Sequence, residues 1–258
     1  MGVLNVTEDS FSDGGAFLQL DEAVEHGVLM AAEGAEIIDV GGESTRPGAE
    51  PVSVEVELAR VVPVIRALRE RLDVAISIDT SKVEVARAAL NAGATIINDV
   101  TGLMDPAMIE LAQVSGAGVV IMHMQGEPRT MQREPHYEDV VGEVRNFFRQ
   151  RYAACLACGM NPRQIAFDPG IGFGKTLEHN LALLRGLPEL GISRRPLLLG
   201  VSRKSFIGRL LGEERMGARD WPTVALTAFL REQGARIFRV HEVKQNLEAL
   251  RMVEAIAG

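Results

Sequence analysis

Cysteines, long apolar runs and clusters of like charge are scarce in this sequence of 258 residues. No uninterrupted apolar stretch reaches the about 18 residues that a membrane-spanning helix needs. The N-terminus also has no basic segment followed by an apolar core, so we expect neither a transmembrane span nor a signal peptide. The formal net charge is −8. This acidic balance argues against nucleic acid or an anionic membrane as a partner.

The two cysteines, Cys155 and Cys158, both fall late in a segment with helical character. A redox C-x-x-C pair opens a helix directly after a strand, and a zinc site needs two further ligands nearby. Neither condition is met here. We therefore expect two packing cysteines in a reducing compartment, which points to the cytoplasm.

Short apolar runs rich in β-branched residues alternate with amphipathic segments along the whole chain. Continuous apolar strands separated by helices indicate a parallel sheet that is covered on both faces. The expected strands are residues 3–6, 36–40, 75–79, 95–99, 119–123, 165–167, 197–201 and 236–240. Repeated right-handed crossovers close such a sheet into a barrel, which typically takes roughly 250 residues. We therefore predict an α/β fold, a single-domain (β/α)8 TIM barrel over residues 1–258; an open doubly wound sheet is the alternative.

Helices are predicted between the strands from apolar positions that recur with helical spacing. Asp21 can cap the first of them, and Pro63 lies inside the second, where we expect a kink or a break. The other helices are expected at residues 83–91, 106–114, about 138–156, 177–187, 206–211, 224–233 and 243–256.

Polar side chains stand at the carboxyl ends of nearly all the predicted strands. They are Asn5, Asp39, Asp79, Asn98, Asp99, His123, Asp168, Ser202, Arg203, Lys204, Arg239 and His241. In a barrel these strand ends meet at one mouth, which is where active sites lie. Each residue could instead cap the following helix, and for Asp39 and Asp99 this alternative is at least as good. Together they predict a ring of donors and acceptors suited to a polar, ring-shaped ligand.

The loop at residues 165–176, IAFDPGIGFGKT, has three glycines on alternate positions after Asp168. Glycines let a backbone approach a ligand closely, so the loop is expected to be shaped around one. It is neither a Walker A loop nor a dinucleotide fingerprint, because Pro169 and Lys175 stand where these motifs need glycine. A tight turn with a helix-capping Asp168 is the alternative.

Cationic side chains gather after the last two predicted strands: Arg203 and Lys204 on one, Arg239 and His241 on the other. Loops at these positions commonly form the phosphate site of a barrel. In a chain of net charge −8, the group predicts an anion-binding site, with ordinary surface cations as the alternative. The polar loops at residues 7–15 and 41–48 are long for a compact barrel, and we expect them to act as lids.

Seven stretches along the chain resemble, in this order, the motifs of the dihydropteroate synthase family. They are GVLNVTEDSFSDGG, DVGGESTRPGA, SIDTSK, INDVTG, FDPGIGFGKT, GVSRKSFIG and RVHEV. The resemblance covers the whole chain. It implies a barrel of folate biosynthesis that joins 7,8-dihydropterin-6-ylmethyl diphosphate to 4-aminobenzoate and releases diphosphate in the presence of Mg²⁺. It also implies a homodimer and a pocket that sulfonamide drugs enter as mimics of 4-aminobenzoate.

The resemblance assigns roles at the pterin end of the site. Asp168 and Asn98 would bind the amino, ring-nitrogen and oxo edge of the pterin, and Asp79 would also face the ring. Lys204 would hydrogen-bond to the pterin. The residues expected to act in catalysis are Lys204, Asp79, Arg239 and His241.

At the other end of the site, the resemblance implies that Arg239 and His241 bind the diphosphate and that Asn5 contributes to the Mg²⁺ site. The 4-aminobenzoate pocket would be formed by Thr45, Arg46, Pro47, Phe173 and Ser205.

The chain departs from the family pattern at two positions and begins directly on its first strand, which predicts a trimmed start. Glu8 replaces a proline, which should loosen the first loop, and Glu242 replaces an aspartate. The nearest alternative is a methyltetrahydrofolate-dependent corrinoid methyltransferase barrel, which would share the Asp and Asn pterin ligands but has no need of S-R-K-S, R-V-H or S-T-R-P-G. A catalytically silent relative would have lost Asn5, Lys204 or Arg239, and all three are present.

Overall fold

The computed structural model describes residues 1–7, 16–45, 48–213 and 215–257, with the side chains of 16–19 left aside. Three predictions from the sequence concern residues outside these ranges. They are the lid formed by the first loop, the loosening effect of Glu8, and the place of Arg46 and Pro47 in the 4-aminobenzoate pocket.

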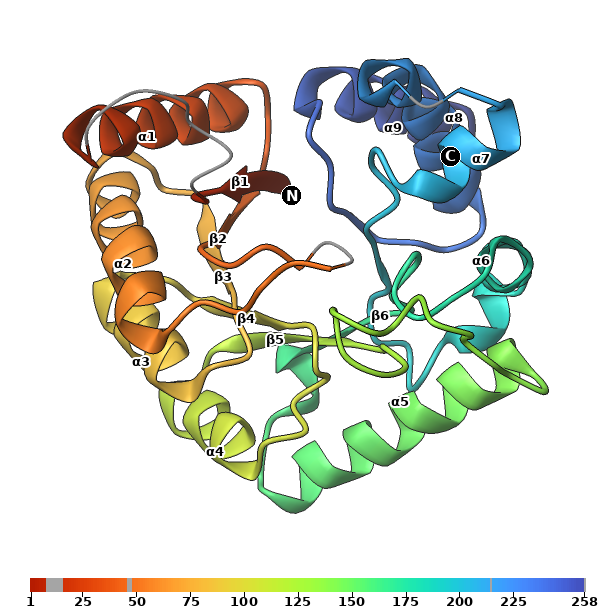
Figure 1. The fold of residues 1–258 in the computed structure, drawn as a ribbon, viewed down its shortest axis with the longest axis horizontal. Helices are drawn as coiled ribbons and strands as arrows, with labels where there is room; N and C mark the ends of the chain where they lie inside the picture. Colours follow the sequence, from red (N-terminus) through yellow and green to blue (C-terminus); the bar gives the residue numbers. More distant parts are fainter. Residues whose placement is uncertain (8–15, 46–47, 214, 258) are drawn as a thin grey trace.

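Parallel strands form the centre of the fold, and helices surround them (Figure 1). The strands are β1 (Gly2–Asn5), β2 (Ile37–Gly41), β3 (Ala75–Asp79), β4 (Ile96–Asp99), β5 (Gly118–Met122), β6 (Ile165–Asp168), β7 (Leu198–Leu199) and β8 (Ile237–Phe238). The first six pair in sequence order, and β7 pairs with β8.

Two backbone bridges join these sheets into a closed barrel. Phe167 bridges Leu197 in front of β7, and Gly2 bridges Val240 beyond β8. The Val3 N–H also donates to the Val240 carbonyl at 3.0 Å. The predicted (β/α)8 barrel is therefore confirmed. β7 and β8 are shorter than predicted; Leu197 before β7 and Val240 after β8 pair only through single bridges.

Nine α-helices lie in the described ranges. They are α1 (Ala16–Ala32), α2 (Val54–Arg71), α3 (Val83–Ala92), α4 (Pro106–Ser115), α5 (Val140–Ala157), α6 (Leu177–Arg185), α7 (Ser205–Leu211), α8 (Asp220–Glu232) and α9 (Val243–Ala257). Short 3₁₀ helices are η2 (Pro162–Gln164), η3 (Leu187–Leu190) and η4 (Met216–Arg219).

Three helix predictions were wrong in detail. Asp21 does not cap α1, which begins five residues earlier, because residues 16–20 contain no helix breaker. α8 begins four residues before the predicted start, since Pro222 falls in its first turn, where proline is tolerated. α2 runs through Pro63, so of the expected kink or break, the break was wrong. Pro63 is exposed, so the carbonyl that it leaves without a helical partner can be hydrated.

The apolar residues form an outer and an inner core, as the alternation of side chains along a strand requires. In β5, Val119 and Ile121 pack in the large cluster between strands and helices, whereas Val120 packs with Ala166 and Leu198 in a separate cluster. The inner cluster fills part of the barrel interior, so the barrel is packed rather than an open pore.

Cys155 and Cys158 form no disulfide. Cys155 is buried, which confirms the packing interpretation for that residue. The same interpretation was wrong for Cys158, which is exposed because α5 ends at Ala157. Within the described ranges, no helix combines the length and hydrophobicity needed to cross a bilayer.

Candidate active site

A cavity of about 310 Å³ opens at the carboxyl ends of the strands. It brings together all the residues to which the family resemblance gave a role and that belong to the described part of the chain. These are Asn5, Thr45, Asp79, Asn98, Asp168, Phe173, Lys204, Ser205, Arg239 and His241. Residues from both ends of the sequence therefore converge on one site, as the closed barrel predicts.

Arg239 joins two carboxylates at one side of the cavity. Its Nε lies 2.6 Å from Asp39 Oδ2, and its Nη2 lies 2.8 Å from Asp79 Oδ2. Asn98 Nδ2 donates to the same Asp39 oxygen at 3.1 Å. Asp39 is fully buried. It is thus the counter-ion that orients Arg239 and Asn98, not a helix cap, and sequence reasoning had left this role unassigned.

Asp79 and Asn5 lie at the ends of β3 and β1, the strands on either side of β2. Burial raises the pKa of Asp79 to about 7, although the Arg239 guanidinium acts in the opposite direction. Gly41 leaves room between the two side chains: a Cβ atom there would lie 3.8 Å from both Asn5 Oδ1 and Asp79 Oδ2. The two oxygen-bearing side chains therefore face the same space.

Asp168 is buried at the end of β6 and accepts a hydrogen bond from the Gly170 N–H at 2.7 Å. Burial raises its pKa, and the Gly170 amide and the Lys204 ammonium act against this shift. The cap of α6 is Thr176, whose hydroxyl accepts from the His179 N–H. The alternative of a helix-capping Asp168 was therefore wrong.

Lys204 extends across the cavity from the turn after β7. Its Nζ lies 3.9 Å from the centre of the Phe173 ring, a cation–π contact. Burial lowers the pKa of Lys204 to about 8, while Asp168 raises it. A Cβ atom at Gly172, whose φ is +83°, would come within 3.3 Å of the Lys204 side chain. Gly172 therefore makes room for this lysine.

The other two glycines of the β6–α6 loop do not face the cavity, in contrast to what the sequence led us to expect. A Cβ atom at Gly170 would lie 1.9 Å from the His123 carbonyl oxygen. At Gly174 it would lie 2.4 Å from the Gln125 carbonyl oxygen. These glycines let the loop pack directly on the segment after β5, so the loop is shaped by a second loop as much as by a ligand.

His123 was expected in the ring of polar residues, but it does not line the cavity. Its ring packs edge-on against Phe147 of α5, and its Nδ1 lies 3.0 Å from Lys175 Nζ. Lys175 is buried and also donates to the Phe173 carbonyl at 2.8 Å. Sequence reasoning assigned no role to Lys175, which joins the loops after β5 and β6.

Asp99 also turns away from the cavity. Its Oδ1 accepts from the Thr101 N–H at 2.8 Å, and its Oδ2 accepts from the Leu103 N–H at 3.0 Å. These bonds shape the turn before α4, whose N-cap is Asp105, so Asp99 neither lines the cavity nor caps the following helix.

His241 follows β8, and its Nδ1 lies 2.8 Å from Ser202 Oγ. Burial lowers the pKa of His241 to about 4, and the nearby Arg203 and Arg239 act in the same direction. At neutral pH the imidazole is therefore uncharged. It can offer an anion an N–H donor.

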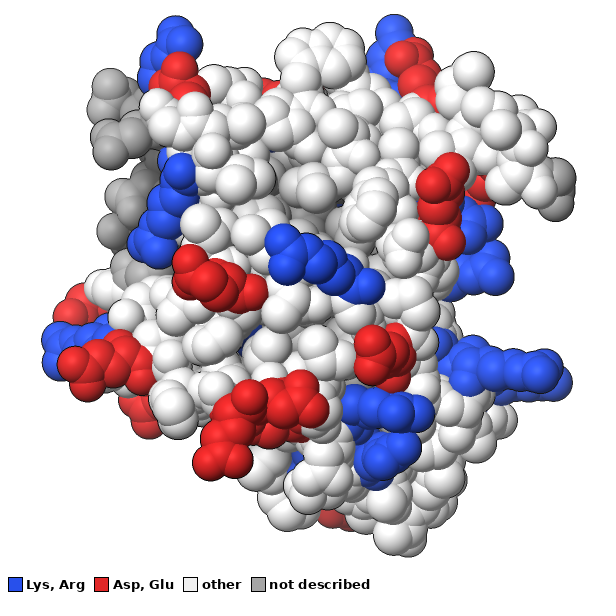
Figure 2. All heavy atoms as spheres, turned by 90° about the vertical axis from the view of Figure 1, so that its right-hand side faces the viewer, with Lys and Arg blue, Asp and Glu red and all other residues white. Residues whose placement is uncertain are grey.

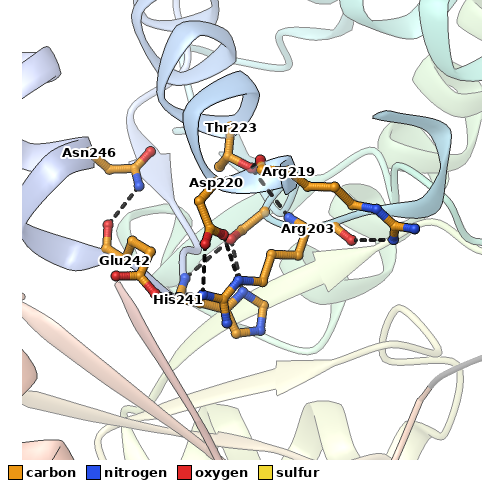
Figure 3. Close-up of polar contacts among 8 residues, drawn as sticks. Arg203, Arg219, Asp220, Thr223, His241, Glu242 and Asn246 are labelled. Carbon is orange, nitrogen blue, oxygen red and sulfur yellow. Dashed lines mark hydrogen bonds and ion pairs between the residues drawn. The ribbon is translucent and has the colours of Figure 1, made fainter. Parts of the chain in front are cut away.

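Arg203 also lines the cavity, and two carboxylates of the protein bind its guanidinium. Its Nε and Nη2 bind Asp220 at 2.6 and 3.1 Å, and its Nη2 also binds Glu242 at 2.5 Å (Figure 3). The four residues of the predicted cationic group do line one cavity, where Arg203 is paired with two carboxylates of the protein; anion binding by the group stays a prediction. Asp220 and Glu242 lie far from Arg203 in the sequence, which gave no signal of this arrangement.

The second long loop is anchored near its start. Glu43 accepts from Lys82 Nζ at 2.6 Å and from the Val52 N–H at 2.9 Å. Lys82 also binds the buried Glu57 of α2. Thr45, which lines the cavity, follows this anchor directly. The anchor had not been found from the sequence, and the action of the loop as a lid stays a prediction.

This fold and this site are those of a known class of enzymes, which a comparison with protein families identifies. Residues 1–241 match the model of the pterin binding enzyme family, and the chain belongs to this family. Its relatives are dihydropteroate synthases. The enzyme of Escherichia coli (strain K12) is 51% identical over 258 residues, covering 99% of this chain and 90% of the relative. The resemblance read from the seven motifs is thereby confirmed.

Solved structures agree with this assignment. The Yersinia pestis dihydropteroate synthase in complex with a sulfonamide drug superposes with a TM-score of 0.93 at 47% identity, covering 100% of this chain and 93% of that one. The Xanthomonas albilineans dihydropteroate synthase with 4-aminobenzoic acid gives 0.94 at 44% identity, covering 100% and 92%.

Proposed function

We propose that this chain is a transferase that condenses 7,8-dihydropterin-6-ylmethyl diphosphate with 4-aminobenzoate to give 7,8-dihydropteroate and diphosphate. The observation that carries the proposal is one cavity in which Asp168, Asn98 and Lys204 lie near Arg239 and His241. The relationship to dihydropteroate synthases over nearly the whole chain supports it. A corrinoid methyltransferase would share the pterin ligands but would not need the Arg239 and His241 pair.

At the pterin end, Asp168 is the principal ligand in our proposal. A carboxylate can accept two adjacent N–H donors of a pterin edge at once. The Gly170 amide fixes the orientation of the Asp168 carboxylate, and Asp39 fixes the Asn98 amide. Lys204, whose Nζ lies over the Phe173 ring, adds a further donor that lines the same cavity. Groups that are held in place before the ligand arrives need less reorganisation during binding.

At the diphosphate end, Arg239 and His241 bind the leaving group. The C–O bond to the diphosphate breaks with its electron pair moving to oxygen, while the amine of 4-aminobenzoate forms the new C–N bond and then releases a proton. Negative charge grows on the diphosphate during this step, so positioned donors stabilise the transition state more than the ground state. Asp79 faces the same space, where its carboxylate can stabilise positive charge on the reacting carbon.

The 4-aminobenzoate pocket that we propose lies beside this point. Phe173, Ser205 and Thr45 line the cavity; Phe173 and Thr45 belong to two loops, and Ser205 is the first residue of α7. Arg46 and Pro47 would complete the pocket. The Xanthomonas relative binds 4-aminobenzoic acid and the Yersinia relative binds a sulfonamide, which supports a pocket of this chemical class. A closed loop over the amine would also exclude competing water.

Asn5 is the residue that we propose for Mg²⁺. In the described ranges, no group of three or more His, Cys, Asp or Glu side chains could hold a metal. Mg²⁺ often binds through one or two protein oxygens together with substrate phosphates, so Asn5 Oδ1 beside Asp79 fits such a site. When bound, the ion would neutralise part of the charge on the diphosphate.

We also propose a cytoplasmic homodimer. The location rests on the unpaired cysteines, which suit a reducing compartment. The dimer rests on exposed apolar side chains of the last helices, namely Leu210, Leu211, Trp221, Phe229, Met252 and Ile256. Exposed apolar groups that gather on one part of a surface mark an interaction site more often than scattered ones do.

The experiment that tests the proposed function is a coupled assay of purified protein for dihydropteroate, with and without 4-aminobenzoate and Mg²⁺. We expect diphosphate release that depends on 4-aminobenzoate and increases with Mg²⁺. Release of diphosphate at the same rate without the amine would contradict the proposal, and so would methyl transfer from methyltetrahydrofolate to a corrinoid protein.

A further inference from the structure

The turn after β7 is held in a conformation that its sequence does not favour. Arg203 has a φ of +59°, in the left-handed region. Residues with a Cβ atom avoid this region, and asparagine tolerates it better than arginine does. The turn must therefore be stabilised by contacts elsewhere in the protein.

The side chain of Arg203 supplies one set of these contacts. Its guanidinium forms a two-pronged pair with Asp220, the first residue of α8, and reaches Glu242 beside His241 (Figure 3). The side chain is only 25% exposed. The planar fork of arginine matches a carboxylate in a way that other side chains cannot reproduce.

The backbone of Arg203 supplies a second set. Its N–H donates to Thr223 Oγ1 at 3.3 Å, and its carbonyl accepts from Arg219 Nη1 at 3.1 Å (Figure 3). The N–H, the carbonyl and the guanidinium of Arg203 are therefore all bound by residues of η4 and α8. These contacts fix a backbone conformation that would otherwise be unfavourable.

Both neighbours of Arg203 in the sequence lie in the cavity wall. Ser202 Oγ lies 2.8 Å from His241 Nδ1 and accepts from the His241 backbone N–H at 3.2 Å. Lys204 lies over Phe173. A change of φ at Arg203 would alter the direction of the chain between these two residues, so both contacts depend on it.

We propose that Arg203 is a positioning residue for the transfer reaction: its left-handed backbone conformation, which the contacts with Asp220 and Glu242 support, directs Lys204 toward the pterin and Ser202 toward His241. The inference rests on the proposed function. It assigns Arg203 a role through the backbone of the turn and no contact with diphosphate.

Two neutral substitutions separate backbone geometry from charge. Arg203→Gln and Arg203→Asn both remove the fork and the charge, but asparagine adopts left-handed φ values several times more readily. We expect kcat to fall about tenfold or more in Arg203→Gln and to stay within about threefold of the unmodified value in Arg203→Asn. Arg231→Gln is the matched control, since Arg231 pairs with Glu254 on the surface between α8 and α9.

The same variants are titrated with inorganic diphosphate by calorimetry, and the ring nitrogens of His241 are followed by NMR. We expect Arg203→Gln to bind diphosphate about tenfold more weakly and to lose the His241 Nδ1 signature of the Ser202 contact, whereas Arg231→Gln keeps both. Equal losses of kcat in the Gln and Asn variants would overturn the proposal, because charge alone would then explain them. A wild-type kcat in Arg203→Gln would overturn it as well.

Two further measurements keep the test decisive if a variant does not fold or if the proposed function is wrong. If Arg203→Gln does not fold, Asp220→Asn removes the paired charge from the other side, and unmodified kcat in that folded variant contradicts the proposal. If the unmodified protein makes no dihydropteroate, the proposed function fails, while the diphosphate titration and the His241 spectra still decide whether Arg203 positions the turn.

Discussion

Arg239 combines two tasks that a surface arginine does not have. It balances the buried carboxylates of Asp39 and Asp79, and its guanidinium lines the cavity. A cation that is already paired and fixed can stabilise a developing negative charge with little reorganisation. Its removal therefore affects both the site and the stability of the carboxylates beneath it.

We predict that Arg239→Ala lowers turnover by roughly 10²-fold, the scale of losing one preorganised donor. Steady-state kinetics with saturating substrates would measure this effect. Arg236→Ala is the control, since Arg236 belongs to the same strand region but is exposed and does not line the cavity. A decrease below threefold in Arg239→Ala would place diphosphate binding elsewhere.

Asp79 should introduce a pH dependence into catalysis. Burial raises its pKa to about 7, so its carboxylate forms as the pH rises through neutrality. If the ionised form stabilises the reacting carbon, kcat/KM falls as the pH drops below about 7. We predict that Asp79→Asn lowers the rate and removes this acidic limb. A limb that persists unchanged in the variant would assign the titration to another group.

At the scale of elements, the β6–α6 loop is held by the segment after β5. Gly170 and Gly174 allow the two backbones to touch, and Lys175 joins them through the His123 ring and the Phe173 carbonyl. The loop carries Phe173 on its cavity side. Packing outside the cavity thus sets the position of a residue inside it.

Lys175→Met tests this arrangement. The substitution removes donors from buried acceptors, and we predict that it lowers the free energy of unfolding by about 2 kcal/mol. It should also raise the KM for 4-aminobenzoate, because Phe173 loses its support. Chemical denaturation and steady-state kinetics measure the two effects. Lys244→Met, at an exposed position of α9, is the control.

The same variant gives a pH signature with a defined sign. Burial lowers the pKa of Lys175 to about 7, against 10.5 for an ordinary lysine. Between these values the unfolded chain binds more protons than the folded one, so this group makes the free energy of unfolding rise with pH. We expect that contribution to be present in the unmodified protein and absent in Lys175→Met; parallel curves above pH 7 would contradict it.

The alternation of side chains along each strand explains which predicted site residues reached the cavity. In β4, Ile97 packs outward, so Asn98 points inward and Asp99 outward. In β5, Ile121 packs outward, and His123 shares its parity and also faces the helices. Whether a residue occupies an inward or an outward position of its strand could therefore be read from the sequence. This signal would have excluded Asp99 and His123 from the predicted ring of polar residues.

Other features of the site could not be predicted in this way. The Arg239–Asp39 pair joins residues 200 positions apart, and the Arg203 turn depends on η4, α8 and Glu242. Such contacts arise only when the barrel closes and brings the first and last strands together. The polar residues at the strand ends predicted where the site lies and which chemical groups it contains. The residues that pair with its charged side chains could be identified only from the tertiary structure.

At the scale of the whole molecule, exposed apolar side chains are concentrated on the C-terminal part of the barrel. Of the twelve exposed large apolar side chains in the described ranges, seven belong to α7, η4, α8 and α9. Figure 2 shows one face of this region, where charged side chains are sparse across the centre of the upper half. An acidic chain with net charge −8 would repel its copy elsewhere more than at such a patch.

We predict that the chain forms a homodimer through this patch and that Trp221→Glu weakens it by at least tenfold in Kd. Trp221 is 75% exposed, and a charge placed in an apolar interface must be desolvated without a partner. Val114→Glu is the matched control, because Val114 is 76% exposed but lies on α4. Sedimentation equilibrium would show twice the 28.0 kDa chain mass for the unmodified protein and for the control. A monomeric unmodified protein, or equal weakening by both substitutions, would show that α7 to α9 do not form the interface.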